Sequence, residues 1–91
     1  MKVPDSAFLA ADTDPHLPEL DLHGVYLVSD ALEELEKNLY WWTQHNIRCA
    51  RVIHGFGSGV LADAVHATLT NHPLIKAWQD APSGGNCIVL L

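Results

Sequence analysis

RVIHGFGSG, at residues 51–59, joins a strand-like apolar run to a glycine-rich loop, and a helical pattern follows it. A second strand-like run, LDLHG at residues 20–24, ends in the same His-Gly pair. If both strands run in parallel, both His-Gly ends lie at one edge of the sheet, where open α/β sheets bind their ligands. The two stretches therefore predict a shallow cleft lined by two imidazoles, a carboxylate and the loop.

Further periodic patterns complete the fold. Apolar residues repeat at helical spacing over residues 29–46, with acidic residues in the first turns, and again from residue 60 to residue 69. Residues 74–79 and 87–91 are typical of two more strands, because they are short apolar runs separated by a Pro- and Gly-containing turn. The predicted element order is β-α-β-α-β-β.

This order predicts an α/β fold, more narrowly an α+β two-layer sandwich, in which both helices cover one face of a mixed four-stranded sheet. Side chains alternate between the two faces of a strand. Leu20 and Leu22 are therefore expected to face the helices, whereas Asp21 and His23 are displayed on the open face.

The N-terminal part of the chain lacks a sustained period. Residues 1–18 contain three prolines together with small and acidic residues, and they show no signal-peptide pattern. We expect a mobile arm or linker over residues 1–18 and one domain over residues 19–91.

Composition restricts the classes of partner. The formal net charge is −6 with five Lys and Arg residues, which counts against tight, non-specific nucleic-acid binding because such binding depends on contacts between cations and phosphates. No apolar stretch approaches the ~20 residues that a membrane helix needs, so no membrane partner is expected. These features predict a cytoplasmic protein.

The two cysteines are far apart in the sequence. Cys49 and Cys87 form no C-x-x-C pair, so we expect buried free thiols and no disulfide. A structural zinc site usually draws on closely spaced ligand pairs, and the sequence contains none.

Asp21 and His23 are the first candidates for chemistry. A carboxylate beside an imidazole can orient it as a general base, and the two side chains could equally bind a divalent cation such as Mg²⁺ or Mn²⁺. The alternative is a solvated strand end without chemical function.

The glycine loop, residues 55–59, is the second candidate. It comprises Gly55, Phe56, Gly57, Ser58 and Gly59, and it lies between a strand and a helix. Backbone N–H groups at such a position favour a phosphate or carboxylate, and glycines permit positive φ and close approach. It is neither a G-x-G-x-x-G fingerprint nor a P-loop. The alternative is a tight turn and nothing more.

Three other residues complete the candidate site. His54 precedes the glycine loop and could act with Asp21 and His23, or it could be a hydrogen-bonded structural residue. Trp78 is expected to share a strand face with Lys76, where an aromatic beside a cation could stack on an unpaired base. Core packing is the alternative role for Trp78.

The motifs together resemble the Smr (small MutS-related) domain. They are LDLHG at residues 20–24, IHGFGSGVL at 53–61, His72-Pro73 and Gly84-Gly85 before the last strand. The resemblance extends from about Glu19 to Leu91. It implies the fold of the C-terminal domain of translation initiation factor 3, and an occurrence either alone or at the C-terminus of a larger MutS2-type protein.

The resemblance also implies a function. Many family members nick DNA or cleave RNA, which implies a role in DNA repair or recombination or in RNA quality control. Asp21 and His23 match the L-D-x-H motif tied to cleavage, and residues 54–57 match the [T/H]-G-x-G loop tied to nucleic-acid contact. Phe56 and Ala62 stand where the family usually has cations, which implies weakened phosphate-binding electrostatics.

The leading hypothesis is a nucleic-acid-binding Smr domain with endonuclease activity on DNA or RNA. His23, helped by Asp21, would act as general base or metal ligand, the amides of residues 57–59 would hold the phosphate, and His54 would protonate the leaving oxygen. The alternative is a non-catalytic module that docks on nucleic acid or on a protein partner through Phe56, Trp78 or Trp41. A small-molecule phosphate binder is a third reading.

Overall fold

The structure, a computed structural model, describes residues 4–91 and forms one mixed sheet with helices on both of its faces. Within these residues there are three helices and four strands, namely α1 (Asp5–Asp12), β1 (Glu19–Asp21), α2 (Val28–Gln44), β2 (Cys49–Ile53), α3 (Val60–Asn71), β3 (Ala77–Asp80) and β4 (Asn86–Leu90). None of these helices is long and apolar enough to cross a membrane.

The sheet brings the two His-Gly stretches together. Its strand order is β1-β2-β4-β3; β1 and β2 are parallel, whereas β4 is antiparallel to both of its neighbours. Asp21 pairs with Ile53, and Ile53 pairs with Asn86. The carboxyl ends of β1 and β2 therefore lie at one edge of the sheet, which we call the carboxyl edge, and this confirms the predicted mixed α+β sheet.

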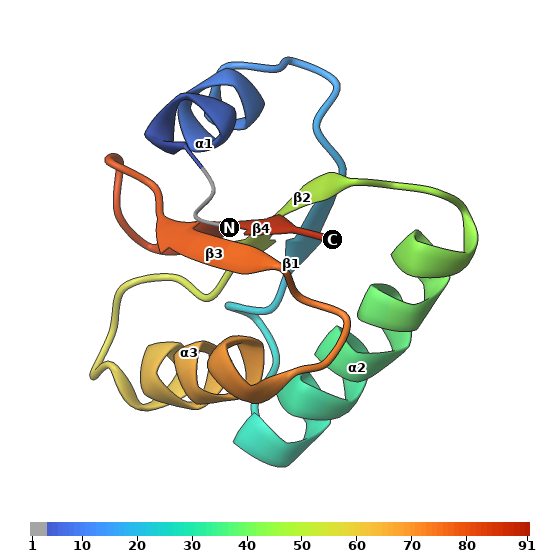
Figure 1. Ribbon diagram of the computed structural model, residues 1–91. Coiled ribbons are helices and arrows are strands. Elements are labelled where there is room, and N and C mark those ends of the chain that lie inside the picture. Colours follow the sequence, from blue (N-terminus) through green and yellow to red (C-terminus); the bar gives the residue numbers. More distant parts are fainter. Residues whose placement is uncertain (1–3) are drawn as a thin grey trace.

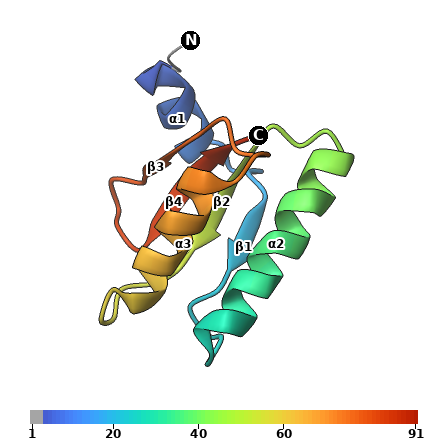
Figure 2. The same ribbon diagram turned by 60° about the horizontal axis from the view of Figure 1, so that its bottom comes forward.

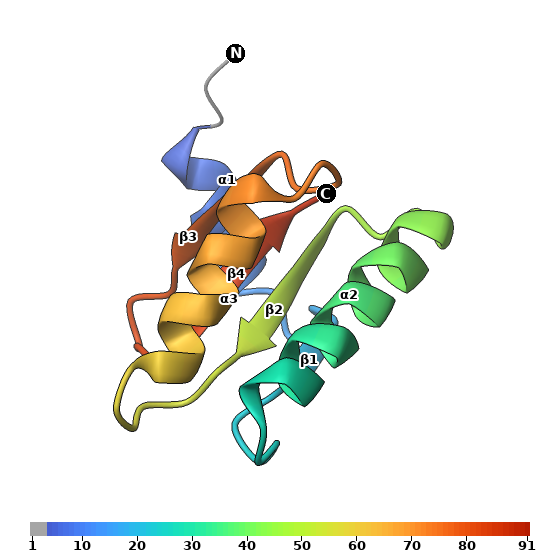
Figure 3. The same cartoon turned by 90° about the horizontal axis from the view of Figure 1, so that it is seen from below.

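The main core lies between the sheet and helices α2 and α3, which cover the same face (Figures 2 and 3). Leu22 is fully buried in this core and Leu20 packs against it, while Asp21 and His23 remain exposed. The alternation predicted for this strand is therefore confirmed. The buried core residues are Leu22, Ala31, Leu35, Leu39, Trp42, Ala50, Val52, Val65, Leu69, Cys87 and Val89.

The opposite face of the sheet carries a helix that the sequence did not predict. Helix α1 packs there, and Phe8 and Ala11 bury themselves with Leu17 against Ala81 and Ile88 (Figure 1). Residues 5–12, part of the segment expected to be a mobile arm or linker, thus form a helix packed on the sheet, and the sandwich has a partial third layer. Two apolar positions three residues apart are too few to make a recognisable helical period.

Arg51 fastens this helix to the sheet. Its Nη1 donates to Asp12 Oδ1 at 2.9 Å, and its Nη2 donates to the Asp12 carbonyl at 3.0 Å. Its Nε lies 3.2 Å from Glu19 Oε2, and Nη1 also donates to Asn86 Oδ1. Only 14% of the Arg51 side chain is exposed, so the contacts of this cation are made within the fold.

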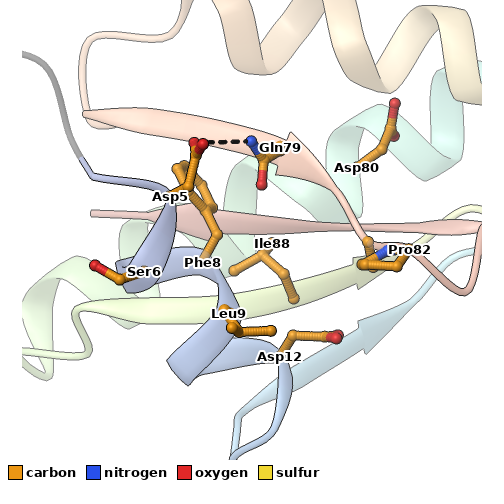
Figure 4. A pocket seen from close by; sticks show the side chains of 10 residues that line it. Asp5, Ser6, Phe8, Leu9, Asp12, Gln79, Asp80, Pro82 and Ile88 are labelled. Atoms are coloured by element: carbon orange, nitrogen blue, oxygen red, sulfur yellow. Dashed lines mark hydrogen bonds between the residues drawn. The ribbon is translucent and has the colours of Figure 1, made fainter.

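A cleft of about 440 Å³ separates α1 from β3 and β4 (Figure 4). Phe8, Leu9 and Ile88 point into it, and the Asp5 carboxylate accepts a bond from Gln79 at its rim. Asp80, in contrast, directs its carboxylate away from α1, toward the other face of the sheet.

Strand β3 begins later than predicted, whereas strand β4 begins close to its predicted position. We expected a strand over residues 74–79, but β3 begins at Ala77. The chain still turns before it, because the Ile75 N–H bonds back to the His72 carbonyl at 3.2 Å. Strand β4 begins at Asn86, one residue before the predicted start.

Candidate active site

The Asp21–His23 pair stands at the end of β1. His23 Nδ1 lies 2.5 Å from Asp21 Oδ1, and the His23 backbone N–H donates to the same oxygen at 3.1 Å. These two bonds, the side-chain bond first, hold the pKa of the Asp21 carboxyl below its usual range. The carboxylate is therefore ionised at neutral pH, and the stability that the pair contributes is present there and lost as pH falls through the lowered pKa.

This geometry suits a general base. An ionised carboxylate beside Nδ1 favours the tautomer in which Nδ1 carries the proton, which leaves a lone pair on Nε2. The carboxylate would also stabilise the imidazolium that forms when Nε2 takes a proton. Because 62% of the His23 side chain is exposed, an incoming nucleophile can reach it.

Gly55 places the glycine loop against His23. A Cβ added to Gly55 would lie 2.8 Å from the His23 Cβ, and the Gly55 φ is +77°. Both values require glycine, because a side chain would collide with His23 and positive φ is unfavourable for other residues. The Gly55 and His54 N–H groups both donate to the Gly85 carbonyl, at 2.8 and 3.0 Å, which anchors the start of the loop.

The remainder of the glycine loop offers backbone donors. Gly57 and Gly59 have φ values of +75° and +88°, and Gly59 is the N-cap of α3 without a side-chain capping bond. Within residues 4–91, the N–H groups of Gly57, Ser58 and Gly59 have no backbone partner. Free amides next to the positive end of a helix suit an anion, and phosphate binding at this loop stays a prediction.

Two exposed aromatic side chains flank these donors. Phe56 and Tyr26 are 78% and 96% exposed, and both line a groove of about 250 Å³ together with His23 and the rest of the loop. The Phe56 ring lies on Gly84 and Gly85, where an added Cβ would approach it to 3.0 and 3.1 Å. Phe56 was predicted from its place in the glycine loop, whereas Tyr26 was not predicted, since a lone tyrosine between a strand and a helix carries no distinctive pattern.

His54 also lines this groove, but the geometry of its ring gives little support to the proton-donor role that we expected, which stays a prediction. Its ring is 8% exposed, its Nδ1 bonds the Gly55 carbonyl at 2.9 Å, and its Nε2 is buried without a partner. Neither ring nitrogen is therefore free to meet a phosphate at the surface. The period-two pattern placed His54 at the strand end but gave no information on how the ring turns.

Lys76 and Trp78 are not part of this site. Lys76 precedes Ala77, which pairs with Leu90 at the end of the sheet opposite the carboxyl edge. Trp78 faces α3, where it stacks on His66 with ring centroids 4.6 Å apart and donates its indole N–H to Thr70 at 3.1 Å. Core packing was the alternative for Trp78, and the structure favours it over a base-stacking role.

Fixed positive charge is scarce around the groove. In the described residues, Arg51 is already paired, and Lys37 lies 3.5 Å from Glu33 on α2. Arg48 and Lys76 precede β2 and β3, at the edge of the sheet opposite the groove. Within residues 4–91, the Lys and Arg side chains are therefore either paired with carboxylates or placed away from the groove. This agrees with the weakened phosphate-binding electrostatics expected from the sequence.

The structure gives little support to a cation held by Asp21 and His23. Within residues 4–91, no third His, Cys, Asp or Glu side chain joins them in a group that could bind a metal. The group of that kind that residues 4–91 do contain lies elsewhere in the fold. Mg²⁺ or Mn²⁺ at this pair therefore stays a prediction.

Fold and site together define a small α+β domain built on a mixed four-stranded sheet. The family model of the Smr domain matches residues 20–91, so the chain belongs to the Smr family. The crystal structure of the Smr domain of Thermus thermophilus MutS2 agrees with a TM-score of 0.78 at 30% identity, covering 82% of this chain and 98% of that one.

Two curated relatives carry the same domain in longer chains. Endonuclease MutS2 of Thermomicrobium roseum is 40% identical over 62 residues, which make up 68% of this chain and 8% of that protein. Ribosome rescue factor SmrB of Shewanella sp. (strain W3-18-1) is 39% identical over 74 residues, or 79% of this chain and 42% of that protein. The chain thus spans less than half the length of either relative.

Proposed function

We propose that this Smr domain binds nucleic acid containing unpaired bases and cleaves its phosphodiester backbone at the Asp21–His23 pair. The observation that carries the proposal is the close approach of Gly55 to His23, which sets a candidate base beside the free amides of the glycine loop. A phosphate held by those amides would lie within reach of the imidazole.

The cleavage step follows from these positions. His23 Nε2 takes the proton from the attacking oxygen, which is the 2′-hydroxyl of RNA or a water molecule. That oxygen forms a bond to phosphorus, the bond to the leaving oxygen breaks, and the leaving oxygen takes a proton from solvent. Asp21 stabilises the resulting imidazolium, and the loop amides stabilise the charge that develops on the phosphate.

Aromatic contacts would compensate for the missing cations. Tyr26 and Phe56 line the same groove as His23, and bases stack on exposed aromatic rings whatever their sequence. A base inside a duplex is already stacked on its neighbours, so this arrangement favours single strands, bulges and loops. This preference is the substrate class that we propose.

Removing the Tyr26 ring tests the proposed mode of binding. We expect Tyr26→Ala to weaken the binding of a fluorescent single-stranded oligonucleotide by about 5–150-fold, the equivalent of the ~1–3 kcal/mol that one stacked base contributes. Tyr40→Ala is the matched control, because Tyr40 is 50% exposed on α2 and does not line the groove. Equal effects of the two variants would contradict the proposed interface.

Restoring a cation in the glycine loop tests the phosphate contact. We expect Phe56→Lys to steepen the plot of log K against log salt by about 0.7, as one added contact to a single strand should, while loss of the Phe56 ring offsets the gain in affinity. Leu9→Lys adds the same charge on α1, where Leu9 is 63% exposed, and should leave the slope unchanged. A slope that changes equally in both variants would show a general charge effect and no loop contact.

The names of the relatives direct the choice of substrate. One relative is an endonuclease and the other a ribosome rescue factor, so plasmid DNA and structured RNA are the first two substrates to compare. We propose a cytoplasmic setting, within a longer protein or beside a protein partner, in DNA repair or RNA quality control.

A protein-docking module is the second candidate. Trp41 is 53% exposed on α2 and stacks on His45 with ring centroids 3.8 Å apart, away from the groove. A rigid exposed aromatic on an acidic domain is suited to a protein partner. Absence of oligonucleotide binding at low salt would favour this candidate over the first.

A further inference from the structure

Four side chains with metal-binding donors meet between α3 and the carboxyl edge of the sheet. They are His54 after β2, His66 on α3, Asp80 at the end of β3 and Cys87 on β4, and we call them the four-ligand cluster. One donor atom from each residue lies within 4.8 Å of all the others. The sequence gave no reason to group them, because each comes from a different element.

His54 presents an unused donor to this cluster. Its Nδ1 lies 2.9 Å from the Gly55 carbonyl, so Nδ1 carries the proton and Nε2 carries the lone pair. This Nε2 is buried without a hydrogen-bond partner in a ring that is only 8% exposed. Metal-binding histidines characteristically donate their other ring N–H to a carbonyl or carboxylate, and His54 has this arrangement already.

His66 is held in a matching position. Its Nε2 is 3.0 Å from Asp80 Oδ1, yet it too is buried without a well-aligned hydrogen bond. Trp78 stacks on one side of the His66 ring, and the His54 ring meets it edge-on at 5.3 Å. Two buried imidazole nitrogens without hydrogen-bond partners are therefore fixed next to a carboxylate.

Cys87 and Asp80 complete the donor set. Cys87 is fully buried, and its Sγ donates a long hydrogen bond to the Val52 carbonyl at 3.9 Å. Asp80 directs its carboxylate toward this side of the sheet and is 61% exposed, which gives an ion a path from solvent (Figure 4). The cluster thus has a buried end and an open end.

We infer that the four-ligand cluster binds one Zn²⁺ ion. Two imidazoles, a thiolate and a carboxylate are ligands that zinc accepts, whereas Mg²⁺ and Mn²⁺ prefer oxygen-rich sites. Binding replaces the thiol proton of Cys87, which passes to solvent, so the thiolate and the carboxylate together offset the charge of the ion. Four protein ligands leave no open position, which marks the site as structural and not catalytic.

Such an ion would brace the proposed active site. It would join α3, β3 and β4 to His54, the residue that directly precedes the glycine loop. The inference does not depend on the proposed nuclease activity, because metal binding is measured without any substrate.

The test is zinc titration of the tag-free chain against a chromophoric chelator, together with the absorption spectrum of the Co²⁺-loaded protein. We expect one equivalent of Zn²⁺ per chain, and a thiolate-to-cobalt charge-transfer band with visible bands typical of four-coordinate Co²⁺. Cys87→Ala should weaken zinc binding at least about tenfold and abolish the charge-transfer band, since loss of a ligand costs at least as much as loss of an outer-shell contact.

Two further variants keep the result decisive. Cys49→Ala removes the other thiol, which is outside the cluster, and should leave zinc binding and the cobalt spectrum unchanged. We expect zinc to raise the Tm of the unchanged chain. Asp80→Asn alters an exposed ligand with little risk to folding, and zinc should not raise the Tm of this variant. Absence of a bound equivalent, or unchanged binding in Cys87→Ala and Asp80→Asn, would overturn the inference. Loss of the ion in His23→Ala alone would also overturn it, because the ion would then occupy a different site.

Discussion

His23→Ala is expected to lower the rate of strand cleavage by about 10²–10⁴-fold, the usual contribution of a positioned general base. The ring is held by Asp21 at the end of β1 and carries no core packing, because 62% of its side chain is exposed. The fold should therefore survive the substitution. The measurement is a nicking assay on supercoiled plasmid and a cleavage assay on structured RNA, each with Mg²⁺, with Mn²⁺ and with EDTA.

Two companion variants sharpen this experiment. Asp21→Asn removes the carboxylate that favours the Nδ1–H tautomer and should lower the rate while keeping the hydrogen-bonded shape of the pair. His45→Ala removes another exposed histidine, which follows the last turn of α2 and stacks on Trp41, and it should change nothing. Unchanged cleavage in His23→Ala would refute the proposed mechanism, whereas equal loss in His45→Ala would show that the loss is not specific to the Asp21–His23 pair.

Local pattern was enough to predict the sheet and the candidate pair. Strict alternation at residues 20–23 fixed which side chains face the helices, and the structure confirms that Leu22 is buried while Asp21 and His23 are exposed. The His-Gly ends predicted a shared edge because parallel strands end on the same side of a sheet. Both inferences depend only on geometry within a strand and between neighbouring strands.

Contacts between elements that lie far apart in the chain could not be predicted from the sequence. Helix α1 is held by Arg51, whose role as an anchor depends on Asp12, 39 residues away. His54 was expected either to act with Asp21 and His23 or to be a hydrogen-bonded structural residue, and only the structure shows that its Nδ1 bonds the Gly55 carbonyl. The periodicity of a strand predicts which face of the sheet a residue lies on. It does not predict whether a side chain at the end of the strand turns inward or stays exposed.

The four-ligand cluster shows the same limit more sharply. The lack of a C-x-x-C pair led to the prediction of buried free thiols, and the structure has Cys87 free and buried but Cys49 free and only half-buried. Burial, with the charge of Asp80 as a second cause, raises the pKa of the Cys87 thiol to about 12. Only the mixed order of the sheet brings β3 and β4 to the end of β2, so no spacing rule along the chain would have found this group.

Gly55→Ala is the second substitution with a large expected effect, because it combines two costs at one position. A residue with a Cβ is strained at φ +77°, and that Cβ would lie 2.8 Å from the His23 Cβ. We expect a loss of unfolding free energy of about 1–3 kcal/mol in urea denaturation, the usual range for such backbone strain. We also expect cleavage to fall, because either His23 or the loop must move.

Two other glycines separate these costs. Gly57 has φ +75° with open space around its Cβ position, so Gly57→Ala should lose stability from strain while keeping the His23 geometry. Gly24 has open space and no positive φ, so Gly24→Ala should be nearly neutral. If cleavage falls equally in Gly55→Ala and Gly57→Ala after correction for stability, the close contact with His23 is not what positions the base. A loss confined to Gly55→Ala would identify this contact as the link between the glycine loop and the Asp21–His23 pair.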